Sequence, residues 1–127
     1  MSNNFNTHIL PFKKNILDSG HSLSEIIIMA SIIEKEAQGK EDSPIISGIL
    51  WKRIKLGMYL QVDASKDTYN MKGLPLEPIS NPGIIAIKAA LYPIESPYLF
   101  YLHDKIGQVH FAKTFTEHKK NINLYLK

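Results

Sequence analysis

The sequence predicts an α+β fold built as one domain, and three observations carry this prediction. Two helix-opening capping boxes are present, Ser22 to Glu25 and Thr114 to Glu117, and a hairpin pattern lies before the second of them. Helices followed by a hairpin and a final helix favour α+β. The 127 residues, 44% of them hydrophobic, suit one domain with one core over residues 1–127. We therefore expect a central buried helix, flanking helices and a short antiparallel hairpin.

The first helix is predicted over residues 22–38. Ser22 and Glu25 satisfy each other's free backbone N–H groups in a capping box. Gly39 is suited to the left-handed geometry that ends a helix. Apolar residues nearly encircle the segment, which is typical of a buried helix.

A second helix is expected from Ser43, as the cap, and Pro44, at the first helical position, to Gly57. Its predicted inward stripe consists of apolar residues at helical spacing: Ile45, Ile46, Ile49, Leu50 and Ile54. Residues 58–63 then read as extended chain, because Leu60 and Val62 alternate with polar neighbours.

Residues 66–83 are rich in glycine and proline and predict a long ordered loop of the kind that forms a binding wall. Asn81 and Pro82 are expected to open a third helix, which runs to Leu91. Residues 98–103 and 108–112 predict the hairpin, and Thr114 opens a final helix.

Composition excludes several classes of protein. Cysteine is absent, which excludes disulfides and thiolate chemistry. The net charge is +3, but Lys and Arg are scattered, which favours a solvated surface over nucleic-acid binding. No apolar run reaches the roughly 20 residues of a membrane span, and residues 1–10 do not resemble a signal peptide. His103, His110 and His118 lack metal-ligand spacing, so we expect neither metal nor cofactor.

Glu34 is the carboxylate that breaks the local pattern. At about 100° per residue, Leu23, Ile27 and Ala30 share its face, whereas Glu36 falls on the opposite, more polar side. A carboxyl in apolar surroundings has a raised pKa, as a general acid requires. The sequence thus predicts Glu34 buried and Glu36 solvated. The alternative is that Glu34 forms a partly buried ion pair, for instance with Arg53.

Six segments in order then resemble one family. The segment from Ala30 to Ala37, ASIIEKEA, is similar to the signature helix of the YceG-like endolytic murein transglycosylases. It is followed by WKRIKLGM, LQVD, YN with GLP, PI and NPG, then YLFY, and finally HFAKT with a later histidine, His118. The resemblance covers about residues 22–127. Members of the family carry a membrane anchor and a LysM-like module before the catalytic part, and we expect neither within residues 1–127.

Three departures accompany the resemblance. The insertion between the family's LQSD and YNTY segments is missing, so Asp63 and Tyr69 are almost adjacent. The second tyrosine of YNTY has no counterpart, and Leu76 and Glu77 stand where Pro and Gly are usual. We therefore expect a shorter rim to the active site.

The resemblance implies a lytic transglycosylase that cuts nascent glycan strands between N-acetylmuramic acid and N-acetylglucosamine, leaving 1,6-anhydro ends. Glu34 would be the catalytic acid/base, on an α+β catalytic domain without metal or cofactor. Substrate-binding residues would come from the predicted wall and its flanks: Gln61, Asp63, Tyr69, Asn70, Gly73 and Asn81.

The implied partners are peptidoglycan strands and penicillin-binding synthases, at the periplasmic face of the bacterial inner membrane. No nucleic acid is expected as a partner. Contact with the membrane is expected only through the family's N-terminal anchor, which is missing from residues 1–127. The main alternative is a glycan-binding module without turnover, and a weaker one is a basic nucleic-acid module.

Overall fold

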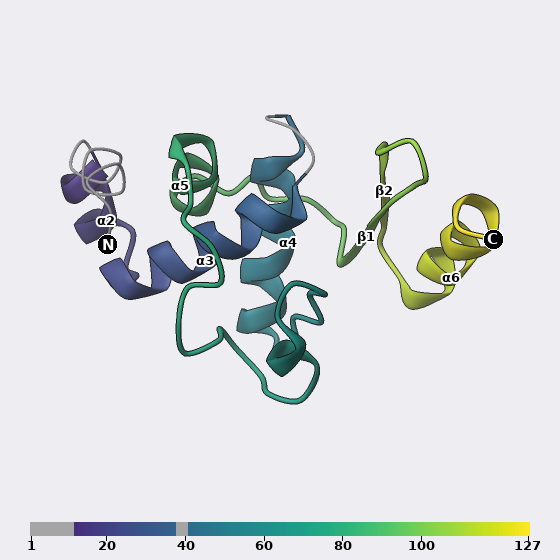
Figure 1. Ribbon diagram of the computed structural model, residues 1–127, viewed down its shortest axis with the longest axis horizontal. Coiled ribbons are helices and arrows are strands. Elements are labelled where there is room, and N and C mark those ends of the chain that lie inside the picture. Colours follow the sequence, from purple (N-terminus) through teal and green to yellow (C-terminus); the bar gives the residue numbers. More distant parts are fainter. Residues whose placement is uncertain (1–11, 38–40) are drawn as a thin grey trace.

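The computed structural model describes residues 12–37 and 41–127 and confirms the α+β prediction (Figure 1). Its elements, in chain order, are α2 (Lys13–Asp18), α3 (Leu23–Glu36), α4 (Ser43–Lys55), the 3-10 helix η2 (Lys66–Tyr69), α5 (Ile84–Leu91), β1 (Phe100–His103), β2 (Val109–Ala112) and α6 (Phe115–Tyr125). Among these residues no helix is long and apolar enough to span a membrane. The expected helix end at Gly39 and the sequence features of residues 1–10 lie outside the described residues.

Helix α3 is the centre of the molecule, with α5 and α4 packed against it (Figure 1). Its predicted capping box is confirmed: the Ser22 hydroxyl accepts from Glu25 N at 3.1 Å, and Glu25 Oε1 accepts from Ser22 N at 2.8 Å. All residues from 26 to 33 are buried. The helix ends at Glu36, because Ala37 adopts an extended conformation with ψ 140°.

The starts of the other helices differ in detail from the sequence prediction. The cap of α4 is Asp42 rather than Ser43, with proline in the first turn. Helix α5 is capped by Gly83, so the predicted cap at Asn81 and Pro82 is wrong. The Thr114 hydroxyl accepts from Glu117 N as predicted, but the carboxylate of Glu117 accepts from Lys113 N. Helix α2 was not predicted, because six residues are too few to show a helical period.

The extended segment before η2 has the alternation that the sequence predicted. Leu60 and Val62 are buried, whereas Gln61 and Asp63 are exposed. The segment is held by a buried hydroxyl: Thr68 Oγ1 accepts from Val62 N at 2.9 Å and donates to Ser65 O at 2.6 Å. These bonds close a short turn that joins η2 to the extended segment.

The hairpin and α6 form the end of the molecule that lies away from α2 (Figure 1). Strands β1 and β2 are antiparallel, and Tyr101 pairs with Phe111. Helix α6 has no fully buried residue and packs mainly on the two strands. Lys52 ties the hairpin to α4, since its Nζ donates to the carbonyl oxygens of Ser96 and Tyr98.

Close packing between α4 and residue 94 gives a test of the fold. A Cβ at Gly48 would overlap Ile94 O, and Ile94 N is bonded to Pro44 O, so this backbone cannot easily withdraw. Glycine to alanine in an exposed helix stabilises by about 1 kcal/mol. We expect Gly48→Ala instead to lower the free energy of unfolding by about 1–3 kcal/mol, measured in urea. Exposed Lys55→Ala in the same helix is the control, and a stabilised Gly48→Ala would contradict this packing.

Candidate active site

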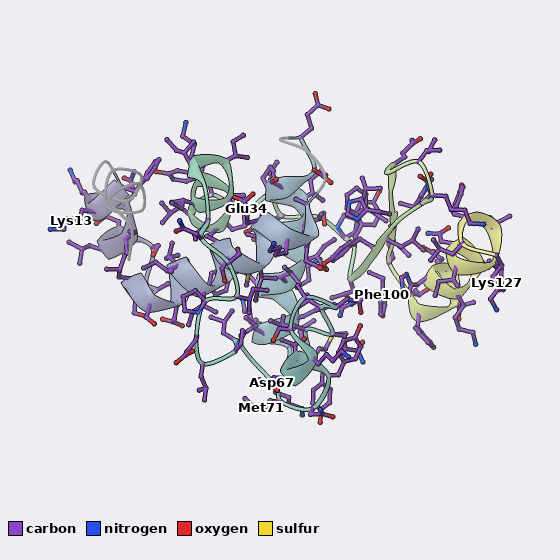
Figure 2. The ribbon with its side chains drawn as sticks, in the orientation of Figure 1. Lys13, Glu34, Asp67, Met71, Phe100 and Lys127 are labelled. Atoms are coloured by element: carbon purple, nitrogen blue, oxygen red, sulfur yellow. The ribbon has the colours of Figure 1, made fainter. Side chains whose placement is uncertain are left out.

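A cavity of about 470 Å³ lies between the helical body and the hairpin with α6. Phe100 stands at the boundary between these two parts (Figure 2). The cavity is open beside Gln61 and Asp63, whose side chains are exposed. Its lining residues combine carboxyl, basic, aromatic and aliphatic groups: Lys35, Glu36, Arg53, Leu60, Gln61, Asp63, Tyr69, Phe100, Tyr101, Leu102, His103, Phe115, His118, Ile122 and Leu126.

Glu36 is the carboxyl of this cavity with the surroundings of a general acid. Burial raises the pKa of Glu36, and the negative charge of Asp63 acts in the same direction. The Tyr101 hydroxyl opposes both effects, since it donates a hydrogen bond to Glu36 Oε1 at 2.5 Å. The net effect is a raised pKa for Glu36, which is what a general acid requires.

Glu34, in contrast, is exposed and does not line the cavity. Its Oε1 accepts a hydrogen bond of 2.8 Å from Gly83 N, at the start of α5. The prediction that Glu34 is buried and Glu36 solvated is therefore wrong. The cause is the helix itself: α3 is apolar on nearly every side, so the helical wheel could not show which side other elements cover at its C-terminal end.

Arg53 is a buried guanidinium that reaches three main-chain carbonyls. Its Nε donates to Leu99 O at 2.9 Å, and its Nη1 donates to Leu60 O at 2.9 Å and to Tyr59 O at 3.3 Å. Its Cζ lies 5.0 Å from the ring centroid of Phe100. It forms no ion pair with any described carboxylate, so the alternative pairing of Glu34 with Arg53 is wrong.

Asp63, Tyr69 and Gln61 do come together in the cavity, as the sequence predicted for one binding region. The Tyr69 hydroxyl donates to Asp63 Oδ1, and this bond is the main reason that the pKa of Tyr69 rises to about 12. Gln61 has a φ of 54°, a left-handed conformation that a glutamine rarely adopts. Such local strain is found most often at functional sites.

The remaining predicted residues divide into two groups. Asn70 lines an adjoining cavity of about 400 Å³ together with Asp63, Lys66 and Tyr69. Gly73 and Asn81 line neither cavity. The predicted wall over residues 61–83 is thus a wall only in its first part. The later part is attached to α3 through Ser31, whose hydroxyl accepts from Ile79 N at 3.0 Å.

Tyr101 and His118 line the cavity, although neither was among the substrate-binding residues expected from the sequence, which favoured a core position for the strand aromatics. Tyr101 and His103 alternate with buried Leu102 on β1, so the strand period could have placed both on one face. His118 stacks on Phe100 with 5.1 Å between centroids, and burial lowers its pKa. Its buried Nδ1 has no hydrogen-bond partner among the described residues. The family resemblance included His118 but implied no role for it.

Fold and site together define a small α+β domain in which a buried helix ends at a carboxyl inside an open cavity of about 470 Å³. The chain belongs to the YceG-like family, whose sequence profile matches residues 1–66 and 67–124. A YceG-like protein from Listeria monocytogenes has a similar crystal structure, with a TM-score of 0.85 and 34% identity, over 91% of this chain and 45% of that one.

Curated relatives carry the name endolytic murein transglycosylase. The protein from Bacillus subtilis is 30% identical over 95% of this chain, and one from Streptococcus pneumoniae is 22% identical over 91%. The chain spans 40% and 26% of their respective lengths.

Glu36 and Glu25, at the two ends of α3, should affect the free energy of unfolding with opposite pH dependence. The pKa of Glu36 is raised above 4.5 by burial, so its contribution to stability is full at pH below 4.5 and is lost as pH rises through the folded-state value. Glu36→Gln should therefore be more stable than the wild type at pH 7, with the difference disappearing toward pH 4. Thermal unfolding at both pH values measures this.

Glu25 provides the matched comparison. The hydrogen bond from Ser22 N lowers its pKa, so its contribution is present above 4.5 and is lost as pH falls. Glu25→Gln should be less stable than the wild type at pH 7, with the difference shrinking in acid. If both variants shifted in the same direction at pH 7, the assigned environments would be wrong.

Proposed function

We propose that this chain is the catalytic part of an endolytic murein transglycosylase and that Glu36, rather than Glu34, is its acid/base. The observation that supports this most directly is the half-buried Glu36 carboxyl, with its raised pKa, at an open cavity that also holds Gln61 and Asp63. The names of the curated relatives give the reaction class. A binding module without turnover has no need of a carboxyl in this state.

The reaction breaks one glycosidic bond without water. Glu36 donates its proton to the oxygen that leaves with N-acetylglucosamine, as positive charge develops on the muramyl anomeric carbon. The resulting Glu36 carboxylate then accepts the proton of the muramyl C6 hydroxyl, whose oxygen bonds to the anomeric carbon. The product is a 1,6-anhydromuramyl end, and Glu36 is protonated again. Since the substrate supplies the nucleophile, the second carboxylate of ordinary glycosidases is not required for attack.

Asp63 is the group suited to stabilise the positive charge of that transition state. It lines the same cavity as Glu36, and its negative charge influences the pKa of Glu36. The hydroxyl of Tyr69 holds the Asp63 carboxylate in place. A fixed carboxylate close to a developing cation lowers the barrier more than a mobile one, because no reorganisation is needed.

The substrate would be glycan strands of the bacterial envelope, bound along Gln61, Asp63, Tyr69 and Asn70. Exposed Phe115 gives the same cavity a surface on which a sugar ring can pack. Action on nascent strands would take place at the outer face of the inner membrane, beside the penicillin-binding synthases. In that setting the enzyme would end strand elongation by removing the growing end from its synthase.

Two conservative variants of α3 test whether Glu36 or Glu34 is the catalytic acid/base. Glu36→Gln should lose about 10²–10⁴-fold in turnover of purified glycan strands, because the amide cannot transfer a proton. Glu34→Gln should keep most of the activity, since the amide oxygen can still accept from Gly83 N. Mass spectrometry of the products measures 1,6-anhydro ends directly. The reverse result would return the catalytic role to Glu34, reducing ends would indicate a hydrolase, and no product from the wild type would favour a binding module.

Gln61 gives a second test, directed at the wall of the cavity. Its exposed amide should hold the sugar that Glu36 protonates, so Gln61→Ala should lower kcat/KM about tenfold, the effect of one lost substrate hydrogen bond. Alanine at position 61 would have the same unfavourable left-handed φ as glutamine, so the free energy of unfolding should change little. Gln108→Ala, an exposed amide at the far end of the hairpin, is the control. Unaltered turnover in Gln61→Ala would show that Gln61 does not bind the substrate and that this segment has only a structural role.

A further inference from the structure

We propose that Tyr101 is a positioning residue for this reaction: its hydroxyl holds Glu36 by Oε1 and leaves Oε2 as the oxygen that exchanges the proton with the substrate. The inference rests on the proposed function of Glu36 and adds to it. The Tyr101 hydroxyl donates to Oε1 at 2.5 Å, and Oε2 has no hydrogen-bond partner among the described residues. The two carboxyl oxygens are therefore not equivalent in the free protein.

Tyr101 is held firmly enough to serve this purpose. It lies in β1 opposite Phe111, and its ring packs against the hydrophobic core. The residues just before β1 are bonded to α4, because Lys52 and Arg53 donate to the carbonyls of Tyr98 and Leu99. The phenol is thus fixed relative to α3 before any substrate binds, which avoids an ordering cost during the reaction.

The charges around Glu36 explain what the hydroxyl contributes besides orientation. Burial and the Asp63 carboxylate favour the protonated form, whereas His103 of β1 and the Tyr101 hydroxyl favour the ionised form. Lys35, Arg53 and Tyr69 also line the cavity, from α3, α4 and η2. A donor to Oε1 stabilises the carboxylate that exists between the two proton transfers, so the same residue can act as acid first and as base second.

Tyr101→Phe tests the proposal, because it removes the hydroxyl and keeps the ring. We expect kcat/KM at neutral pH to fall about 10- to 100-fold, as the carboxyl loses its fixed orientation. The pKa of Glu36 should rise, since the carboxylate loses its donor, and the alkaline limb of the pH–rate profile should move to higher pH with it. A carboxyl-carbon NMR titration of Glu36 in the purified protein follows the same change without substrate.

Tyr98→Phe is the matched control on the same hairpin. Tyr98 stacks on Phe111, with 5.1 Å between the ring centroids, and its hydroxyl makes no hydrogen bond with any described residue. This variant should leave the pH–rate profile and the Glu36 titration where they are in the wild type. If Tyr101→Phe unfolded, 3-fluorotyrosine at position 101 would replace it: a more acidic phenol is a stronger donor and should lower the pKa of Glu36.

Several outcomes would overturn the proposal. In the first, Tyr101→Phe lowers the rate equally at all pH values and leaves the Glu36 titration unchanged, as a packing role alone would do. In the second, Tyr98→Phe has the same effect as Tyr101→Phe. A Glu36→Gln variant with full activity would instead refute the catalytic assignment, and the titration would still report whether Tyr101 controls the carboxyl.

Discussion

The buried guanidinium of Arg53 is the interaction on which the rest of the site depends. It joins α4, the extended segment at Tyr59 and Leu60, and the chain entering β1, and these carry the two sides of the cavity. Burying a charge costs several kcal/mol, and hydrogen bonds to charged groups return about 1.5–3 kcal/mol each. Because one planar cation bonds to three carbonyl groups, the positions of α4, the extended segment and the chain entering β1 depend on one another. Lysine could not meet this geometry.

The short connection after Asp63 is the second constraint. Thr68 closes it through its buried hydroxyl, and the turn of η2 brings Tyr69 back to Asp63. A longer insertion would separate these two side chains along the chain. Here the Asp63 carboxylate and the Tyr69 hydroxyl are joined locally, so the rim of the cavity is small and the carboxylate that lines it is held in place.

Local rules predicted most of the fold and only part of the site. The capping box at Ser22, the alternation around Leu60 and the hairpin each depend on neighbouring residues, so the sequence alone was sufficient for them. The choice between Glu34 and Glu36 depends on β1, which is more than sixty residues away along the chain. A helix that is apolar on nearly every side carries no information about which carboxyl a distant tyrosine will contact.

The end of α3 at Glu36 has an electrostatic consequence of its own. The last carbonyl groups of a helix lack intrahelical partners and give that end a partial negative charge of about half an elementary charge. A carboxylate formed at the terminal residue of α3 meets this dipole unfavourably, whereas a neutral acid does not. In the proposed mechanism, the helix backbone would therefore favour the second proton transfer, in which the Glu36 carboxylate accepts the proton of the C6 hydroxyl.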